Sequence, residues 1–379
     1  MILGCFAIVL FLHKNNLMEI TSYKKETSER SENQNWVLAE IANSIDYYYA
    51  GFEGCNENIA NEVTSLLDRA SIEITTPDSI MPGNDDVYKA IREIENKALH
   101  GKIKFCHRLG LPYTYVLYNY GYEIVLRYEI TGSDILFKEK YESFSSFSSW
   151  IQSIKGWNSG KKFREKQDLP EFDKALRRSG CPWPTNIDCV AFSSNNEPIA
   201  IIEFQNAKDT GVEKHLNNIY FLPYRDNRDY KIKRGRDEQR WRSQEILRQQ
   251  SKLPHLTIVW SQSEEVVVIK ILDAVTFPEI KDRVDNSSYA IELNMFRDVI
   301  SKDPKNMENK FYDSIRNKYQ SYNLKYEGDR MGTVINEPPL SYGSKTFPFI
   351  YGRRIITSKK GSVKEDLEGL LSSLGNGIY

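Results

Sequence analysis

Asp188, Glu203 and Gln205 stand out as polar residues in the mostly apolar stretch from Cys181 to Lys208. Residues 199–202 (IAII) are typical of a buried strand, so Glu203 directly follows residues expected in the core. An unpaired carboxylate there costs on the order of several kcal/mol to desolvate, and it is tolerated when it binds a cation. If Asp188 and Glu203 meet across a hairpin, their oxygens form the kind of site that Mg²⁺ prefers.

The spacing of Glu203 and Gln205 indicates which face of the strand their side chains share. Glu203 and Gln205 are two apart on a predicted strand, so they share one face while Phe204 points to the other. Hydrolysis of a phosphodiester needs a metal that stabilises the developing charge and an activated water in line with the scissile bond. Two carboxylates would hold the metal, and a third polar group beside them would orient the water.

A helix is predicted immediately upstream of these strands. Asp168 is suited to be its N-cap, Pro170 fits its first turn, and Gly180 stops it. The helix carries the acids Glu171 and Asp173. The local order is therefore helix, strand, turn, strand.

A second helix is predicted downstream, over residues 236–250, followed by strands at 256–260 and 266–272. Ten basic and five acidic residues lie between Arg225 and Lys252, a local excess of five basic residues (10 − 5). Basic side chains here would contact phosphates, although a solvated helix face is the simpler interpretation. Trp241 would either stack on a base or pack in the core.

This arrangement resembles the PD-(D/E)xK nuclease superfamily, the restriction-endonuclease-like fold. Its signature is an Asp that opens one strand and Glu-x-Lys on the next, which Asp188 and Glu203 match. Gln205 stands where the family usually has Lys. This sequence is similar in that respect to some restriction endonucleases of the superfamily, which also have Gln at this position. The resemblance covers residues 160–275 and implies an α/β (α+β) fold with a central mixed sheet flanked by helices, in the order α-β-β-α-β.

The resemblance also implies an activity and a set of site residues. It implies a Mg²⁺-dependent endodeoxyribonuclease, a type II restriction or defence enzyme, with Asp188 and Glu203 binding the metal and Gln205 positioning the water. Lys208 or Lys214 would substitute for the missing lysine. Glu171, or else Asp173, would be the acid that the family often has on the preceding helix. The expected partners are DNA and a second copy of the chain, with phosphate contacts from Lys208, Lys233, Arg234, Arg236 and Arg240.

Composition excludes several other classes. No GxxxxGK[ST] or GxGxxG run is present, so the motifs of triphosphate hydrolysis and dinucleotide redox chemistry are missing. The five cysteines include no CxxC pair, which argues against a zinc site or disulfide framework and favours a cytoplasmic protein. A net charge of −1 means that any nucleic-acid surface is a local patch.

The remaining chain divides into segments by composition. Residues 1–35 are interpreted as a flexible or artefactual lead-in; the apolar residues 1–12 are too short to span a membrane, and a short anchor is the alternative interpretation. Residues 36–155 are expected to form a helical and β module for recognition or regulation. Residues 156–325 would be the nuclease-like domain, and 326–379 an irregular basic tail.

Further elements are predicted from hydrophobic periodicity. Helices are expected at 36–49, 58–69, 85–99, 144–154, 289–300 and 308–319, and strands at 113–119, 123–130 and 135–137.

Two other functions remain open from the sequence alone. The missing lysine motivates a catalytically inactive nuclease-like module that binds nucleic acid. The same residues would also serve a nuclease acting on RNA or branched DNA.

Overall fold

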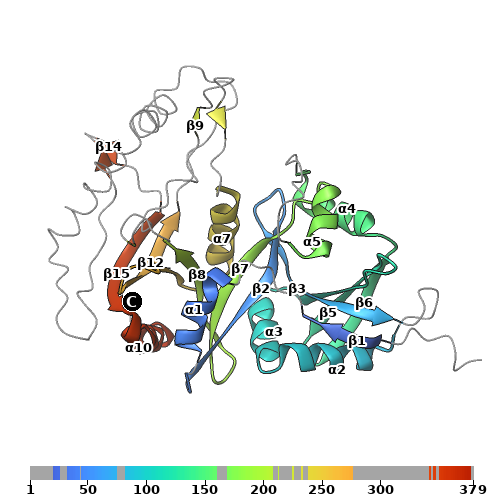
Figure 1. Cartoon of the computed structure of the whole chain (residues 1–379), viewed down its shortest axis with the longest axis horizontal. Coiled ribbons are helices and arrows are strands. Elements are labelled where there is room, and N and C mark those ends of the chain that lie inside the picture. Colours follow the sequence, from blue (N-terminus) through green and yellow to red (C-terminus); the bar gives the residue numbers. More distant parts are fainter. Residues whose placement is uncertain are drawn as a thin grey trace, which may run out of the picture. The chain divides into compact units, whose positions relative to one another are not determined.

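The computed structural model describes residues 20–25, 32–42, 44–74, 82–159, 169–207, 212, 224–225, 232–233, 238–275, 341–342, 345–346 and 350–376. They form a mixed α+β protein in which mixed β-sheet is flanked by helices, as the sequence predicts (Figure 1). The chain divides into two compact units. The first unit comprises residues 1–31 and 52–186, and the second comprises 32–51 and 187–379.

The first unit is a sheet covered by helices on both faces. β3 pairs in parallel with β4, and its other strand pairs, including β1 on β3, are antiparallel. The strands are β1 (Ile20–Lys24), β3 (Val63–Ile74), β4 (Tyr113–Tyr118), β5 (Val125–Thr131) and β6 (Asp134–Tyr141). Strand β2 (Tyr47–Glu57) contributes its residues from Phe52 onward, and its earlier residues belong to the second unit. The helices are α2 (Asn84–Glu95), α3 (Ala98–Arg108), α4 (Phe144–Lys155) and α5 (Glu171–Arg178).

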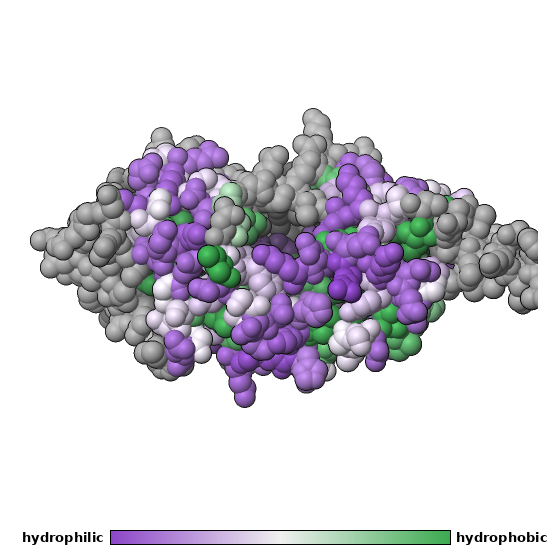
Figure 2. All heavy atoms as spheres, turned by 90° about the horizontal axis from the view of Figure 1, so that it is seen from below, coloured by the Kyte–Doolittle hydropathy of each residue, from purple (hydrophilic) through white to green (hydrophobic). Residues whose placement is uncertain are grey.

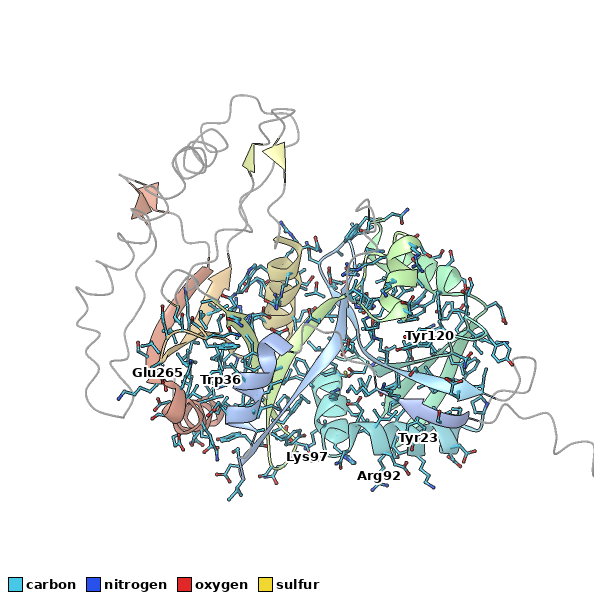
Figure 3. All side chains as sticks on the ribbon, in the orientation of Figure 1. Tyr23, Trp36, Arg92, Lys97, Tyr120 and Glu265 are labelled. Carbon is cyan, nitrogen blue, oxygen red and sulfur yellow. The ribbon has the colours of Figure 1, made fainter. Side chains whose placement is uncertain are left out.

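An aromatic core joins α4 and α5 to one face of this sheet. Tyr118 of β4 stacks on Phe172 of α5 with ring centroids 4.0 Å apart. Tyr120, labelled in Figure 3, accepts a hydrogen bond from the Phe172 backbone N–H at 3.4 Å. Helix α4 begins at a capping box formed by Ser143 and Ser146 and ends at Gly156, whose φ of +69° suits a residue without a Cβ.

A buried polar group, which we call the Lys102 cluster, lies between α3 and the other face of the sheet. It consists of Lys102, Asp68, Glu95, Tyr113 and Tyr115. Lys102 Nζ lies 2.7 Å from Asp68 Oδ2 and 2.7 Å from Glu95 Oε2. The Tyr113 hydroxyl donates to Asp68 Oδ2 and the Tyr115 hydroxyl to Glu95 Oε1, at 2.7 and 3.1 Å. Each acid of the cluster therefore has an ammonium and a hydroxyl partner.

The second unit carries the residues of the predicted site. Its sheet has the order β15-β12-β11-β8-β7, with the first part of β2 next to β7. β8 and β11 are parallel, and the pairs β7–β8, β11–β12 and β12–β15 are antiparallel. The strands are β7 (Thr185–Ser193), β8 (Pro198–Asn206), β11 (His255–Trp260), β12 (Val266–Val275) and β15 (Ile350–Lys359). The helices are α1 (Glu32–Ile41), α7 (Glu238–Ser251), α10 (Val363–Gly375) and the 3-10 turn η3 (Lys360–Ser362).

Two short strand pairs complete the described elements. β9 (Tyr224–Arg225) pairs with β10 (Ile232–Lys233), and β13 (Ser341–Tyr342) pairs with β14 (Lys345–Thr346).

Helices α1 and α10 share one face of the second sheet. Ile202 and Phe204 of β8 form a core there with α1 residues Val37 and Ile41, and α10 adds Val363, Leu367, Leu370 and Leu371. Trp36, labelled in Figure 3, packs against Trp260 with ring centroids 5.0 Å apart. Residues that alternate with Ile202 and Phe204 along β8 face the opposite side, which is the side of α7.

Polar side chains predominate among the described residues on the face drawn in Figure 2. The face in Figure 2 is largely hydrophilic, with small separate hydrophobic areas among the described residues. The most exposed large apolar side chain is Ile45, at 94%. Single exposed apolar residues are normal on protein surfaces, so they indicate no docking site by themselves.

Gly51 marks a close approach of two backbone segments. A Cβ on Gly51 would lie 2.5 Å from the carbonyl oxygen of Asp188, closer than real atoms come. Gly51 is the last residue of the first segment of the second unit, and Ile187 is the first residue of its second segment. The two segments therefore meet within one sheet of the second unit.

The predicted helix at 58–69 is wrong, because residues 63–74 form strand β3. The apolar spacing fits a helix, but residues 58–62 form a tight turn after β2. Asn58 O accepts the Asn61 N–H at 3.1 Å, and Asn61 adopts a φ of +59°, which Asn tolerates better than most residues. The turn returns the chain as a strand that β2 and β4 pair on both sides.

The predicted helix at 36–49 is too long at its end and starts too late. Helix α1 begins at Glu32 and ends at Ile41, and β2 begins at Tyr47. Ser44 Oγ accepts the Tyr47 N–H at 3.1 Å, a local turn that competes with helix. Residues 20–24 form β1, so part of the expected flexible lead-in is ordered strand.

The irregular C-terminal tail is also wrong, because β15 pairs with β12 and α10 covers the core. Val363, Leu367, Leu370 and Leu371 recur at helical spacing, a signal overlooked beside the nearby glycines.

Several other predicted elements are confirmed within one to three residues at most ends. These are the strands at 113–119, 123–130, 256–260 and 266–272 and the helices at 144–154 and 236–250. The helix predicted before Gly180 forms as α5, but it begins at Glu171 with Pro170, and not Asp168, at the N-cap position. The strand at 135–137 is longer, as β6, and the helix at 85–99 ends at Glu95 where Asn96 has a φ of +51°. The helices expected at 289–300 and 308–319 lie outside the described residues, as do residues 1–19. The compact units also have other bounds than the segments drawn from composition.

Candidate functional site

Strand pairing places Asp188 and Glu203 opposite each other. In the antiparallel β7–β8 pair, Cys189 lies opposite Ile202 and Val190 opposite Ile201. The same register, continued by one residue, sets Asp188 of β7 across from Glu203 of β8. Directly opposite residues of an antiparallel pair point to the same face, so both carboxylates face α7. We call these two residues the acid pair.

The acid pair is buried and is held from several sides. The Asp188 side chain is 0% exposed and that of Glu203 is 2% exposed. Asp188 Oδ2 accepts the backbone N–H of Phe204 at 3.1 Å, which fixes this carboxylate against β8. A buried carboxylate needs such partners, because leaving water costs it most of its solvation.

Two side chains of α7 complete the site. Arg240 Nη2 lies 3.1 Å from Asp188 Oδ2 and also contacts Glu203 Oε1. Gln244 Nε2 donates to the other Glu203 oxygen, Oε2, at 2.5 Å. Arg240 and Gln244 are four residues apart and so project from the same side of the helix. One guanidinium group thus bridges the two carboxylates.

The position of α7 follows from the chain path. β8 and β11 are parallel neighbours, with Glu203 paired to Thr257, and parallel strands require a crossover connection. Helix α7 lies in that crossover and buries Trp241 and Leu247. Trp241 therefore packs in the core, as the simpler of its two interpretations predicts.

The Glu203 carboxyl group is harder to ionise than an exposed one. Burial raises the pKa of Glu203 well above its usual range; the Arg240 guanidinium opposes this, and the Asp188 carboxylate raises the pKa further. Asp188 also raises it through a hydrogen bond, whereas the Gln244 amide lowers it. Two facing carboxylates disfavour a second negative charge. A cation placed between them stabilises the doubly ionised pair.

The buried polar row continues beyond the acid pair. Thr257 of β11 pairs with Glu203 on one side and with Lys270 of β12 on the other. The Thr257 and Lys270 residues are only 3% and 1% exposed. The sequence interpretation missed both. The available signal was a lysine in the middle of the apolar run VVVIKIL at 266–272.

Buried polar atoms around this row lack partners among the described residues. They are Gln244 Oε1, Thr257 Oγ1 and both ring nitrogens of His255. Burial, and to a lesser degree the charges of Arg248 and Arg240, lower the pKa of His255 to about 3. A strip of unmatched hydrogen-bonding capacity therefore runs between α7 and the sheet, a condition that native interiors rarely show without a reason.

The other predicted site residues have contacts of their own within their unit, or they lie outside the described residues. Gln205 lies two residues after Glu203, half-buried, and no side-chain contact from it to the acid pair is seen in the described part of the chain. Glu171 opens α5 in the first unit, is 61% exposed on its side chain, and accepts from Lys174 Nζ at 2.6 Å. That hydrogen bond lowers the pKa of Glu171. Asp173 pairs with Arg69 at 2.5 and 3.0 Å, a structural partner within the first unit.

The predicted phosphate-binding residues are mostly not placed. Lys208, Lys214, Arg234 and Arg236 lie outside the described residues, and Lys233 is described only as part of β10. Arg240 is the exception, and its described contacts are to the acid pair. The roles assigned to these residues stay predictions.

A cation fits the acid pair by its chemistry. Both groups are hard carboxylate oxygens, they face the same point, and they already hold the positive guanidinium group of Arg240. Within the described residues, no group of three or more His, Cys, Asp or Glu side chains is arranged to hold a metal. A metal here would therefore rely on two carboxylates, amide oxygens and water.

Comparison with protein-family models, with curated proteins and with solved structures finds no match to this chain. Among the described residues, none of the helices has the length and apolar character needed to cross a membrane.

Proposed function

We propose that the chain is a Mg²⁺-dependent endodeoxyribonuclease with a PD-(D/E)xK core, acting as a type II restriction or defence enzyme. The observation that carries this proposal is the acid pair. Its two buried carboxylates lie opposite each other on neighbouring strands and together hold the guanidinium group of Arg240. Apart from the short strands β9 and β10 between β8 and α7, the element order α5-β7-β8-α7-β11, with β11 parallel to β8, agrees with the order of that core.

The roles of the chain's own groups follow from their positions. Asp188 and Glu203 would hold the metal, which when bound would stabilise the charge that develops on the scissile phosphate. Gln205, on the same side of β8 as Glu203, would position the attacking water. Basic groups near the start of α7 would orient the phosphate backbone.

Cleavage of plasmid DNA by the purified protein tests the proposal. We expect nicked or linear products with Mg²⁺, none with EDTA, and none from Asp188→Asn or Glu203→Gln with Mg²⁺. Glu265→Gln is the matched control, because Glu265 is an exposed carboxylate in the same unit, labelled in Figure 3. Absence of cleavage on every DNA offered, or cleavage that survives Asp188→Asn, would contradict the proposal.

A second function is favoured by one specific observation. Arg240 takes up the carboxylate oxygens that a metal would use, and the motif lysine is replaced by Gln205. Both features suit a nuclease-like module that binds nucleic acid without cutting it. This alternative predicts salt-dependent DNA binding in the presence of EDTA, together with no cleavage. Affinity that stays constant between 50 mM and 200 mM salt would exclude it.

A further inference from the structure

Arg240 and a divalent cation would need the same oxygen atoms. Arg240 Nη2 contacts Asp188 Oδ2 and Glu203 Oε1, one oxygen of each carboxylate of the acid pair. Those oxygens are buried, so the guanidinium group lies where a cation entering the pair must go. Cation–cation repulsion at such distances is strong in a partly desolvated site. Binding of Arg240 and binding of a metal to the pair are therefore mutually exclusive.

Of these three side chains, Arg240 is the one able to leave. Its side chain is 33% exposed, whereas those of Asp188 and Glu203 are 0% and 2% exposed. Arg240 lies in the first turn of α7, and Gln244, one turn later, stays 2% exposed. The long arginine stem can rotate toward solvent without unfolding the helix. The carboxylates, anchored by Phe204 N–H and Gln244, would remain in place.

A displaced guanidinium group needs a new anion. The acid pair with a divalent cation is electrically neutral, so it no longer attracts Arg240. A phosphate oxygen of a nucleic acid accepts an arginine in the same planar, two-pronged geometry as a carboxylate. A phosphate beside the pair would therefore stabilise the state in which the metal is bound, and the metal would stabilise phosphate binding.

We propose that Arg240 is a built-in competitor for the divalent cation: it closes the acid pair in the absence of nucleic acid and transfers to a substrate phosphate when the metal binds. This inference rests on the proposed function, because it concerns the same site. It assigns Arg240 to the regulation of metal occupancy in addition to contact with the backbone.

The test is calorimetric titration of the full chain with Mn²⁺ in the absence of DNA. We expect Arg240→Gln to bind Mn²⁺ at least tenfold more tightly than the wild-type chain. Arg248→Gln is the matched control, because Arg248 lies on the same helix but pairs with Glu245 at 2.7 Å, and its Mn²⁺ affinity should equal that of the wild type. The double variant Arg240→Gln/Asp188→Asn should lose the added affinity, which would locate the metal at the acid pair.

If thermal melting in EDTA shows that Arg240→Gln does not fold, Arg240→Lys replaces it in the titration. Lysine keeps the charge but lacks the planar fork, so we expect Mn²⁺ binding several-fold tighter than wild type. Equal or weaker Mn²⁺ binding in the folded Arg240 variants, or no binding in any chain, overturns the inference. The calorimetric measurement contains no DNA, so it separates the two proposals. Tighter Mn²⁺ binding by Arg240→Gln without plasmid cleavage by the wild-type chain would contradict the proposed function alone. Plasmid cleavage with an unchanged Mn²⁺ affinity of Arg240→Gln would contradict this inference alone.

Discussion

The Lys102 cluster of the first unit and the acid pair of the second unit both bury two carboxylates beneath a helix, but they balance charge differently. In the Lys102 cluster, Lys102 bridges the two acids, a second ammonium from Lys25 lies 2.5 Å from Glu95, and two tyrosine hydroxyls donate to the acids. In the acid pair, two carboxylates share one guanidinium group.

This difference separates a structural cluster from a candidate site. A balanced, fully hydrogen-bonded group rigidifies a core, and nothing about it requires a further ligand. A pair in which Glu203 resists ionisation, beside polar atoms that lack described partners, leaves capacity for a cation that would stabilise both carboxylates in their ionised form. Perturbed ionisable groups of this second kind are enriched at functional sites, although ion-pair networks also produce them.

The largest expected effect is that of Lys102→Met in the first unit. Removing Lys102 leaves Asp68 and Glu95 facing each other in the interior, and loss of one partner of a buried ion pair costs about 3–5 kcal/mol. Urea unfolding measures the change. Lys104→Met, an exposed lysine on the same helix, is the control and should change stability by less than about 0.5 kcal/mol. A loss below about 1 kcal/mol for Lys102→Met would contradict a stabilising role of the Lys102 cluster.

A matched pair of Asp→Asn variants sharpens the comparison. Asp68 accepts from Lys102, Tyr113 and the Glu53 N–H, so Asp68→Asn should lose about 2–3 kcal/mol. Asp188→Asn should stay within about 1 kcal/mol of wild type, because the amide oxygen can still accept from Phe204 and one of two facing negative charges is gone. Equal losses in urea unfolding would mean that the acid pair is as structural as the Lys102 cluster.

The two units should also differ in their response to acid. The pKa of His255 is lowered to about 3, so the unfolded chain takes up a proton below pH 6.5 while the folded chain does not, and stability falls as pH drops from 6.5 toward 3. At pH 5 this amounts to about 2 kcal/mol, at about 1.4 kcal/mol per pH unit. His255→Phe should flatten this slope in unfolding measured between pH 5 and 7; an unchanged slope would assign the acid sensitivity elsewhere.

The first unit loses stability in a lower pH window. Burial alone would raise the pKa of Glu95, but the ammonium groups of Lys102 and Lys25 outweigh it and lower the pKa to about 2. The stabilisation is therefore present above pH 4.5 and lost as pH falls from 4.5 to 2. Hydrogen exchange resolved by residue distinguishes the two windows, and Glu95→Gln should remove the lower one.

The smallest expected effect concerns the polar row beside the acid pair. Thr257 Oγ1 has no partner among the described residues, so Thr257→Val should leave stability within about 0.5 kcal/mol or raise it by about 1. Ser65→Ala is the contrast, because Ser65 Oγ accepts from Asn56 at 2.9 Å in the first unit, and its loss should cost about 1–2 kcal/mol. A loss above 1 kcal/mol for Thr257→Val would indicate that its hydroxyl is bonded in solution.

The sequence predicted what depends on local pattern. The apolar run before Glu203 and the turn after Asp188 set a hairpin whose register brings the acids together. The partners of the acid pair were not predictable in the same way, because Arg240 and Gln244 come from a helix that reaches Glu203 through the parallel β8–β11 pairing. Arg240 was predicted as a phosphate contact, with a solvated helix face as the simpler interpretation, and not as a partner of the acid pair. Likewise Lys270 gains its place beside Thr257 only through long-range pairing.

Two of the wrongly predicted segments share a physical cause. Residues 63–74, expected as helix, and residues 350–359, expected as irregular tail, become strands because neighbouring strands pair with them. The error at 58–69 had a local correction available, since Asn61 is a residue type that favours a tight turn.

Gly51 and Ile187 bound a long segment that is inserted into the second unit. Residues 52–186 leave the second unit after Gly51 and return to it at Ile187, and the backbone of Gly51 lies against that of Asp188. A segment whose ends adjoin in space can be exchanged for another without stretching its host. An exchange of residues 52–186 that keeps the acid pair would also have to replace β1, because Ile20–Lys24 pairs with β3 inside that segment.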